Sequence, residues 1–562
     1  MIFSLTVKKL TINYAGNQRR SPDIPACGKS KHLDAMALSL KIMNTLYYII
    51  FVLLTRLGGL STYNNNGWFQ SEEGNTRSTT DRQNEQVNLN QSQSPFPDTY
   101  KNSIPMTAAA LDPNVTLEKT GDSDVSHSQT VGVRGPVLVQ DTVLHETLET
   151  FVFSTTLPRR IHTKGYGAFG YFYTTHSMKQ YTNAGFLQTP NQQVPVAVRF
   201  SLAASNQGTP DTSRNVRGFS TKFYTDEGIF DLLCNHLPVF FVRDAIRVPD
   251  IISHLSPSPV NNLPDPERLW SLFAKYPEAT NMLIWFFSDL GTIKSLRHIK
   301  GYSVSTYVWR NAQGVRHYVK YHWYPVAGVE YIDRQEAQCL ACQDPNIAGR
   351  DLYDSIAKGT AVEYDLRVQL MNPDDAKLLP FDPLDDTKVW DEAVYPLLPV
   401  GRMVLNHNPD NYAEQVEKLA FNPANLLPGL EVSDDKVLQG RTFIYPDAQR
   451  HRLGPDFRNI PVNKQPNWSP ASMVSSGNGR YVAGEIMRAE IPNPDDFTQA
   501  SQKYESFSAT EKKNLADNIA SSLVDAQPNT QYAVLWHLEQ VSPVLAEMVR
   551  NQMRLYPGTA GR

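Results

Sequence analysis

Six runs of apolar, β-branched and aromatic residues between positions 194 and 371 constrain the fold of this chain most strongly. They alternate in parts between apolar and polar residues, and Gly, Pro and Asn turns separate them, which is the pattern of an antiparallel β-barrel with helical insertions. After Asp495 the apolar spacing becomes helical. The sequence therefore predicts an α+β fold with an N-terminal arm, a β-barrel, a wrapping segment and a C-terminal helical domain. The six runs are VPVAVRFSLA, GFSTKFYT, PVFFVRD, YSVSTYVWR, RHYVKYHWYPV and AVEYDLRVQLM.

Changes in composition predict where the parts of the chain begin and end. Residues 62–105 are rich in Asn, Gln, Ser, Thr and Gly, so they cannot bury enough surface to offset the entropy of ordering. The stretch 400–490 is rich in Pro and Asn with little periodicity, as expected of a segment that wraps over a surface. The predicted parts are an N-terminal extension with a possible signal segment (1–61), a polar linker and N-terminal arm (62–134), the barrel core (135–406), the wrapping segment (407–494) and the C-terminal helical domain (495–562).

An apolar run from Ile42 to Thr55 leaves the compartment open. Its length suits the central region of a signal peptide and is too short for a comfortable membrane span, so we expect no stable membrane insertion of the mature protein. If translation begins at Met36 or Met43, the run predicts export to the periplasm or the medium. Otherwise it is a non-structural extension on a cytoplasmic protein. The final residues carry no S-K-L-type peroxisomal signal.

Charge and cysteine content exclude two other classes of protein. The chain has 53 Lys and Arg against 57 Asp and Glu and no long basic run, so we expect no nucleic-acid partner. Four cysteines in 562 residues exclude a disulfide scaffold. Cys339 and Cys342 form a C-x-x-C that suits a redox pair or half a zinc site. However, no second ligand pair follows and the surrounding pattern is helical, so we interpret them as ordinary helical cysteines.

Two segments about 280 residues apart carry the chemistry. The first, LPRRIHTKGYGAFGYF at 157–172, places His162 among basic, small and aromatic residues, and a histidine suits proton transfer because its pKa lies near working pH. The second, DKVLQGRTFIYPDAQRHRLGP at 435–455, places Arg441 four residues before Tyr445. On a helix these two share a face, so the guanidinium favours the ionised phenol. A phenolate is a hard anionic ligand that suits ferric iron.

Both segments resemble the haem-containing monofunctional catalases, and the resemblance runs from about Gly135 to Met553. It implies haem b as the cofactor and the conversion of two hydrogen peroxide molecules to water and dioxygen through an oxoferryl porphyrin radical. It also implies a homotetramer with a role in oxidative stress. Tyrosine is the known proximal iron ligand of catalases, so Tyr445 takes this role by resemblance and not by derivation.

The resemblance also implies roles around the substrate. His162 would move a proton between the two peroxide oxygens, Asn235 in LLCNHLPVFF would offer its amide to one of them, and Ser201 in AVRFSLA would fix the tautomer of the imidazole. The propionates would pair with three arginines, Arg159, Arg199 and Arg452. Because the family pattern before the distal histidine is one residue longer, Arg160 is an alternative to Arg159.

Around the iron ligand, His298 in RHIKGYS and Asp435 resemble residues that hold the proximal arginine in place. Two positions depart from the family. Val248 stands where most members stack an aromatic side chain on the distal haem face, and Asn215 stands where an acidic residue is usual near the substrate entrance.

Two further departures argue against bound NADPH. Tyr276 and Glu392 occupy positions where members that retain the nucleotide have arginine and histidine, so NADPH is an unlikely cofactor. Val248 and Asn215 also motivate an alternative function, a catalase-fold peroxidase or an organic-hydroperoxide enzyme. A third hypothesis is a haem-free binding protein, but the retention of the catalytic and iron-ligating residues opposes it.

Overall fold

The computed structural model describes residues 156–464 and 495–556, together with positions 142, 144, 146 and 491. The apolar run at 42–55 and the polar linker and arm at 62–134 lie outside the described residues. None of the described helices is long and apolar enough to cross a membrane.

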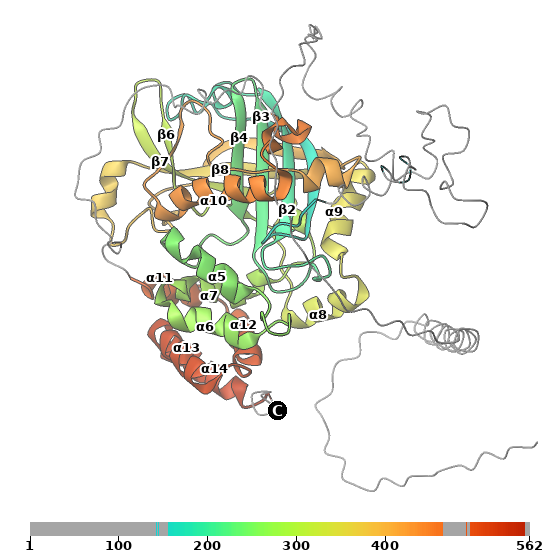
Figure 1. Ribbon diagram of the computed structural model, residues 1–562. Coiled ribbons are helices and arrows are strands. Elements are labelled where there is room, and N and C mark those ends of the chain that lie inside the picture. The colour runs from blue at the N-terminus through green and yellow to red at the C-terminus, as the bar shows by residue number, and fades with distance from the viewer. Residues whose placement is uncertain are drawn as a thin grey trace, which may run out of the picture. The chain divides into compact units, whose positions relative to one another are not determined.

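Within the described residues, eight antiparallel strands close into a barrel, because β7 pairs with β8 as well as with β5 (Figure 1). Closure leaves no edge strand open in this ring. Two further strands, β6 (Tyr307–Arg310) and β10 (Leu430–Val432), extend the sheet beside β7. The ring consists of β1 (Gly165–Thr174), β2 (Gln193–Leu202), β3 (Arg217–Thr225), β4 (Gly228–Asn235), β5 (Gly301–Tyr302), β7 (Arg316–Pro325), β8 (Val362–Met371) and β9 (Leu398–His407).

The predicted α+β barrel is confirmed, although not every strand lies where the sequence pattern put it. Four runs become β2, β3, β7 and β8, and a turn divides YSVSTYVWR into β5 and β6. The prediction of a strand over 238–244 is wrong, because β4 ends at Asn235 and this apolar run packs among helices instead. Strand β1 escaped notice because it is rich in glycine. At Gly170 any side chain would collide with the Val404 carbonyl of the neighbouring strand.

Helices cover one end of the barrel and form the C-terminal part (Figure 1). The C-terminal helices pack against α6 and α7 around a shared apolar core, as the periodicity after Asp495 predicted. Cys339 and Cys342 both lie in α8, in agreement with the helical interpretation. The α-helices are α5 (Val248–Leu255), α6 (Pro266–Lys275), α7 (Thr280–Phe287), α8 (Arg334–Gln343), α9 (Ile347–Ala357), α10 (Lys436–Leu453), α11 (Thr498–Glu505), α12 (Ala509–Leu523), α13 (Pro528–Val541) and α14 (Pro543–Met553).

Short helical turns connect these elements. A π-helix, η7 (Ala413–Glu417), lies in the predicted wrapping segment, where one face of its turn is buried. The remaining turns are 3₁₀-helices: η1 (Gly185–Leu187), η2 (Ala245–Arg247), η3 (Pro277–Ala279), η4 (Asp289–Gly291), η5 (Leu296–His298), η6 (Pro373–Leu378), η8 (Phe457–Asn459) and η9 (Pro461–Asn463).

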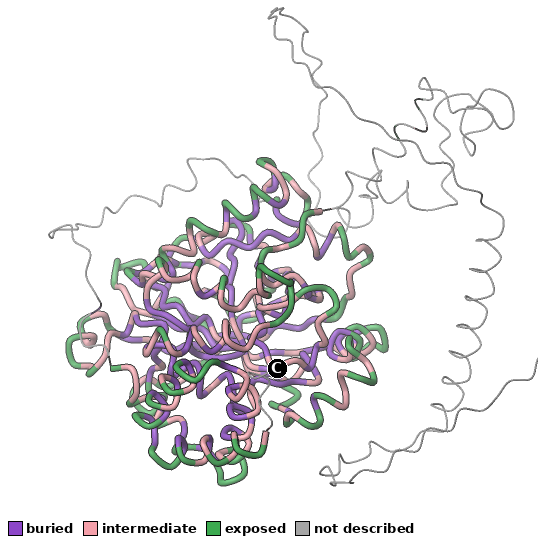
Figure 2. Tube along the Cα trace, turned by 60° about the horizontal axis from the view of Figure 1, so that its bottom comes forward, coloured by how far each residue is buried: buried purple, intermediate pink, exposed green. Residues whose placement is uncertain are grey.

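Aromatic side chains fill the barrel interior, so the site must lie outside it. The Phe219 and Trp323 rings stack with centroids 5.8 Å apart, and the edge of Phe172 meets Trp323 at 6.2 Å. Burial is densest along these strands, and exposed residues lie mainly in loops and on outer helix faces (Figure 2). Because strand side chains alternate between faces, a second apolar cluster forms on the outer barrel face. It includes Leu233 of β4 and packs against Tyr445 of α10.

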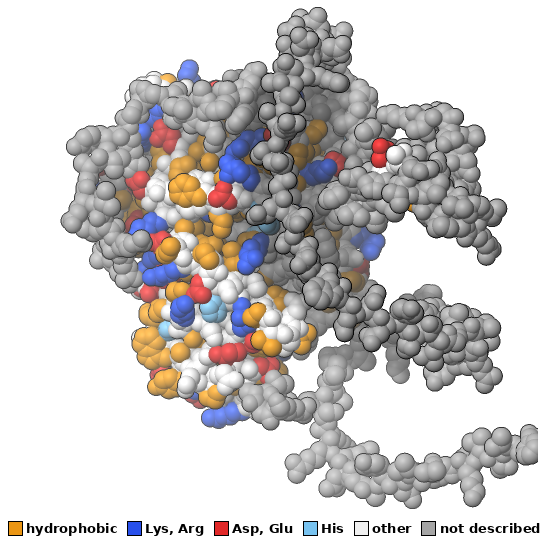
Figure 3. All heavy atoms as spheres, viewed as in Figure 1, with side chains coloured by type: hydrophobic (Ala, Val, Ile, Leu, Met, Phe, Trp, Pro, Cys, Tyr) orange, Lys and Arg blue, Asp and Glu red, His pale blue; other side chains and the backbone are white. Residues whose placement is uncertain are grey.

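The described surface carries both signs of charge. On the face shown in Figure 3, Lys and Arg side chains lie interspersed with Asp, Glu and apolar side chains, and among the described residues they do not gather into one basic patch. Long-range attraction of a polyanion needs such a patch.

Candidate active site

His162 sits in a strained backbone conformation immediately before β1. Its φ is 61°, in the left-handed region that a residue with a bulky side chain rarely adopts. Three hydrogen bonds hold it there. The His162 N–H donates to the Ala203 carbonyl at 2.8 Å, and the Arg199 guanidinium donates to the carbonyls of His162 at 2.9 Å and Thr163 at 3.0 Å. Backbone strain that is maintained by surrounding hydrogen bonds is characteristic of functional positions.

The His162 imidazole is partly buried and is surrounded by cationic side chains. Its Nδ1 lies 2.9 Å from the Ser201 Oγ, so the serine orients the ring as predicted. Burial, followed by the charges of Arg199, Arg159 and Arg441, lowers the pKa of His162 to about 3. The ring is therefore unprotonated at neutral pH, the state in which a base can accept a proton. Glycine is required beside it, because a Cβ at Gly218 would lie 2.8 Å from the imidazole Nδ1.

Strand register brings Asn235 to the same place. Ser201 of β2 pairs with Gly218 of β3, and Gly218 pairs in turn with Asn235, the last residue of β4. Residues directly opposite each other in an antiparallel sheet point to the same face. Ser201, the small Gly218 and Asn235 thus form one row, and His162 lies against it.

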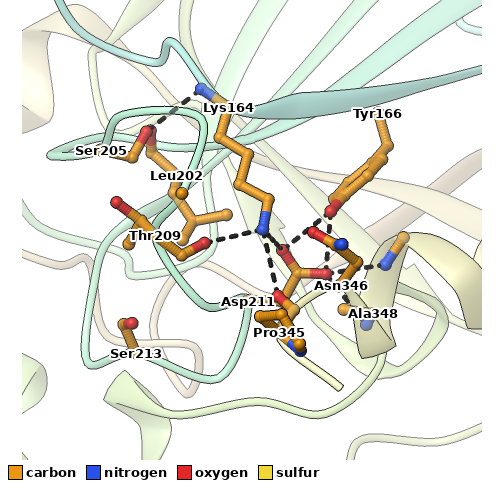
Figure 4. Close-up of polar contacts among 12 residues, drawn as sticks. Lys164, Tyr166, Leu202, Ser205, Thr209, Asp211, Ser213, Pro345, Asn346 and Ala348 are labelled. Carbon is orange, nitrogen blue, oxygen red and sulfur yellow. Dashed lines mark hydrogen bonds and ion pairs between the residues drawn. The ribbon is translucent and has the colours of Figure 1, made fainter. Parts of the chain in front are cut away.

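A buried ion pair anchors the chain just after His162. Lys164 Nζ lies 3.0 Å from the Asp211 carboxylate and also donates to the carbonyls of Thr209 at 2.7 Å and Pro345 at 3.1 Å. The same carboxylate accepts from the Tyr166 hydroxyl at 3.0 Å and from backbone N–H groups at the start of α9 (Figure 4). The start of β1 is therefore tied to two other parts of the fold.

Three arginines surround a single carboxylate, that of Glu417 at the end of the π-helix. The Glu417 carboxylate lies 2.8 Å from Arg159, 3.8 Å from Arg452 and 3.9 Å from Arg199. Arg160, by contrast, is exposed, so Arg159 is the member of this cluster. The sequence analysis did not single out Glu417, which had no motif of its own.

The arginine cluster lacks negative charge. Burial, together with the charges of Arg199 and Arg452, holds the pKa of Arg159 well below its usual value, and burial lowers that of Arg452 to about 10 despite Glu417. Three guanidinium groups against one carboxylate leave an excess of two positive charges in a buried place. A ligand with two carboxylates would neutralise this excess.

The predicted pair Arg441 and Tyr445 lies on α10, one turn apart and on the same face. The centre of the Arg441 guanidinium is 5.5 Å from the centroid of the Tyr445 ring. Arg441 also donates to the Leu233 carbonyl at 3.4 Å, which ties α10 to β4 two residues before Asn235. Although burial acts to lower it, the neighbouring Tyr445, Tyr307 and Asp386 raise the pKa of Arg441, so it stays cationic beside the phenol.

The predicted contact between His298 and Arg441 is wrong. His298 ends η5, and its Nδ1 lies 2.9 Å from the Gly328 carbonyl. Arg441 donates instead to the Ser305 Oγ at 3.0 Å, because the turn after β5 carries Ser305 inward. Asp435 caps α10 by accepting from the N–H groups of the next turn at 2.8 and 2.9 Å, so it supports the helix that carries Arg441.

The departures from the resemblance have structural explanations. Asn215 is buried and makes two hydrogen bonds to the backbone of Ala204, at 3.1 and 2.7 Å, so it braces the loop that holds His162. Val248 begins α5 and packs against the helical core. Tyr276 donates to Asp250 at 2.7 Å, whereas Glu392 lines a cavity of about 680 Å³ with Lys320, Trp285 and Trp390.

The residues present suit a haem group. Within the described ranges, no group of three His, Cys, Asp or Glu side chains is placed to hold a metal ion. Tyr445 beside Arg441 offers its phenol oxygen as one ligand, and the excess charge of the arginine cluster suits two propionates.

Comparison with known proteins identifies the family. Residues 118–493 match the family model described as Catalase, and residues 490–553 match the one described as Catalase-related immune-responsive. The chain belongs to the catalase family. The catalase of Listeria seeligeri is 40% identical over 456 residues, which cover 76% of this chain and 93% of that protein. Catalase isozyme 2 of Nicotiana plumbaginifolia is 37% identical over 460 residues, covering 76% and 94%.

Solved catalase structures share the fold. A fungal catalase superimposes with a TM-score of 0.73 at 34% sequence identity, covering 78% of this chain and 95% of that one. Catalase A from Saccharomyces cerevisiae gives a TM-score of 0.70 at 32% identity, covering 77% and 97%. The similarity to catalases thus spans the barrel and the C-terminal helices together.

Proposed function

We propose that this catalase-family enzyme decomposes hydrogen peroxide to water and dioxygen, with haem b held between His162 and Tyr445. The observation that carries the proposal is that a serine-oriented imidazole and an arginine-paired tyrosine meet in one region of the fold. Arg441 acts electrostatically on His162 and also contacts the strand that ends at Asn235.

The chain's own residues would divide the work as follows. The His162 imidazole would accept a proton from one peroxide oxygen and return it to the other, and the Asn235 amide would hold the substrate by donating to an oxygen. The Ser201 hydroxyl would keep the ring oriented. Haem, when bound, supplies the redox chemistry at iron.

Tyr445 would hold the iron as a phenolate, and Arg441 would keep that ligand ionised. Arg159, Arg199 and Arg452 would bind the two propionates, because the cluster has two more positive than negative charges. Each anion would then be buried against a fixed cation, which offsets its loss of hydration.

Two measurements on the purified protein test the proposal. The absorption spectrum should show a Soret band, and added hydrogen peroxide should yield one dioxygen for every two peroxides consumed. An organic hydroperoxide with a reducing co-substrate is the comparison for the alternative peroxidase function. Faster turnover of the organic substrate than of hydrogen peroxide would favour that alternative, and protein that takes up no haem would refute both.

We further propose that the protein retains little NADPH. Glu392 and Asp391 place two acidic side chains on the 680 Å³ cavity, and the Lys320 ammonium there already donates to the Val304 carbonyl at 2.8 Å. Acidic side chains repel phosphate at close range. Nucleotide released on denaturation should therefore be far below one per chain, and a near-stoichiometric amount would contradict the proposal.

Two remaining proposals concern the whole protein. A homotetramer is expected from the resemblance, and light scattering of the native enzyme measures its mass. We also propose that residues 42–55 act as a cleaved export signal when translation begins at Met36 or Met43. If the protein isolated from its native cells keeps residues 42–55 and fractionates with the cytosol, export is refuted.

A further inference from the structure

Two buried polar side chains, Ser305 and Asp386, form a chain of hydrogen bonds that ends on Arg441. The Ser305 hydroxyl accepts from Arg441 Nη1 at 3.0 Å and donates to the Asp386 carboxylate at 2.8 Å. A serine hydroxyl has one proton, so an acceptor on its far side leaves its lone pairs free for the guanidinium. Asp386 thereby sets the direction in which Ser305 can bind Arg441.

The backbone next to Ser305 is strained, and this conformation points the Ser305 hydroxyl toward Arg441. Val304 has a φ of 61°, which is an outlier for a β-branched residue. Buried partners hold the strained turn. The Lys320 ammonium donates to the Val304 carbonyl at 2.8 Å, and the Ser303 hydroxyl donates to the Ser305 carbonyl at 3.0 Å. The Thr306 N–H donates to the Asp435 carboxylate at 3.2 Å.

Two carboxyl groups and two cationic side chains lie together around this chain of contacts. Asp386 and Asp435 are each 1% exposed and interact directly, and their cationic neighbours are Lys320 and Arg441. Burial raises the pKa of both carboxyls, and Asp435 raises that of Asp386 further. Asp435 also caps α10, so the pair joins the helix that carries Tyr445 to the turn that carries Ser305.

We propose that Ser305 and Asp386 are positioning residues for Arg441 and, through it, tune the electron density of the Tyr445 phenolate that holds the haem iron. This inference rests on the proposed function. A guanidinium fixed against the phenolate withdraws charge from it. A guanidinium released from Ser305 would leave the phenolate a stronger donor to ferric iron, which lowers the midpoint potential of the haem.

The test compares four variants of the haem-loaded enzyme with one matched control. Ser305→Ala removes the acceptor of Arg441, and Asp386→Leu removes the acceptor that orients Ser305. Ser305→Thr keeps the hydroxyl, and Asp386→Asn keeps an acceptor oxygen in a similar volume. The control is Asp385→Asn, a neighbouring buried carboxylate that accepts from the Thr387 hydroxyl at 2.7 Å.

The readouts are the ferric absorption spectrum, the midpoint potential and the haem dissociation constant. Ser305→Ala and Asp386→Leu should shift the spectrum, lower the potential and weaken haem binding by about tenfold or more, the usual effect of removing a residue that orients a metal ligand. Ser305→Thr, Asp386→Asn and Asp385→Asn should resemble wild type in spectrum and potential.

Each outcome decides the matter. Loaded Ser305→Ala with an unchanged spectrum and potential would overturn this inference alone, as would a shift of equal size in Asp385→Asn. Should Ser305→Ala fail to fold, the difference between Asp386→Leu and Asp386→Asn decides in its place. Wild-type protein that takes up no haem would overturn the proposed function and this inference together.

Discussion

The His162 side and the Tyr445 side of the site lie in the same region of the fold, but opposite electrostatic effects set the charge of their key residues. On the His162 side, burial among cations lowers the pKa of the imidazole to about 3 and keeps it neutral. On the Tyr445 side, Arg441 stays charged, with buried carboxyls behind it. The contrast shows that burial by itself does not set the charge of a group, because the partner that is buried with it decides.

The construction of the two sides differs as well. Strained backbone and neighbouring strands position His162, and its partners come mainly from residues 199–235. A helix positions Tyr445, and its support comes through side chains from distant segments. Substitutions on the first side should therefore change proton transfer, whereas those on the second should change the iron and its binding.

The largest expected effect is on the first side. His162→Ala should bind haem with a Soret band and lose about 10²–10⁴-fold in peroxide decomposition, the usual contribution of a general acid–base group. The rate of dioxygen release measures this loss. His298→Ala is the control, since that ring contacts the Gly328 carbonyl at 2.9 Å and lies 3.9 Å from the Glu330 carboxylate. If His162→Ala decomposed peroxide at a rate within about tenfold of wild type, the proposed role of this side in proton transfer would be wrong.

Tyr445→Phe tests the other side. The variant loses the one anionic ligand that α10 offers, so haem affinity should fall by about tenfold or more and the ferric spectrum should change. Haem titration followed by absorbance gives both values. In the control, Tyr224→Phe, the lost hydroxyl donates to the Val462 carbonyl at 2.8 Å, within the same apolar cluster. Full occupancy with an unaltered spectrum in Tyr445→Phe would mean that another residue holds the iron.

The neutral histidines predict an acid limit to stability. The pKa of both His162 and His322 is lowered by burial to about 3, against about 6.5 unfolded, so between these values the unfolded chain binds more protons. Their contribution to the free energy of unfolding is complete above pH 6.5 and is lost as pH falls toward 3. Each should remove on the order of 2 kcal/mol by pH 4.5. Denaturant unfolding at pH 7.5 and 4.5 measures the loss, and equal stability at both values would refute it.

The smallest effect concerns the loop that supports His162. In Asn215→Asp the side chain can no longer donate to the Ala204 carbonyl, so the free energy of unfolding should fall by about 1–3 kcal/mol. Asn206→Asp is the matched control, because Asn206 uses its side-chain oxygen as an acceptor, which Asp retains. Thermal melts of the two variants give the comparison. A larger loss in Asn206→Asp would contradict this role of Asn215.

Local pattern was enough to predict much of this molecule. Alternation in the runs that become β2, β3, β7 and β8 gave the barrel, and the spacing of four between Arg441 and Tyr445 put both on one face of α10. These features depend on the repeat of a strand or a helix, and this repeat can be recognised within a short stretch of sequence. The motif around His162 likewise lies within sixteen consecutive residues.

Contacts between distant segments were decided only by the tertiary structure. Arg441 meets Ser305, 136 residues earlier, and Ser305 meets Asp386, 81 residues later, although neither partner belongs to a motif. The family resemblance suggested His298 instead, and no sequence motif pointed to Glu417, which lies among three arginines. The sequence by itself determined which residues can do chemistry. Barrel closure and the strained turn at Val304 decided which of them meet, because burial in three dimensions, and not spacing along the chain, selects the partners of a charge.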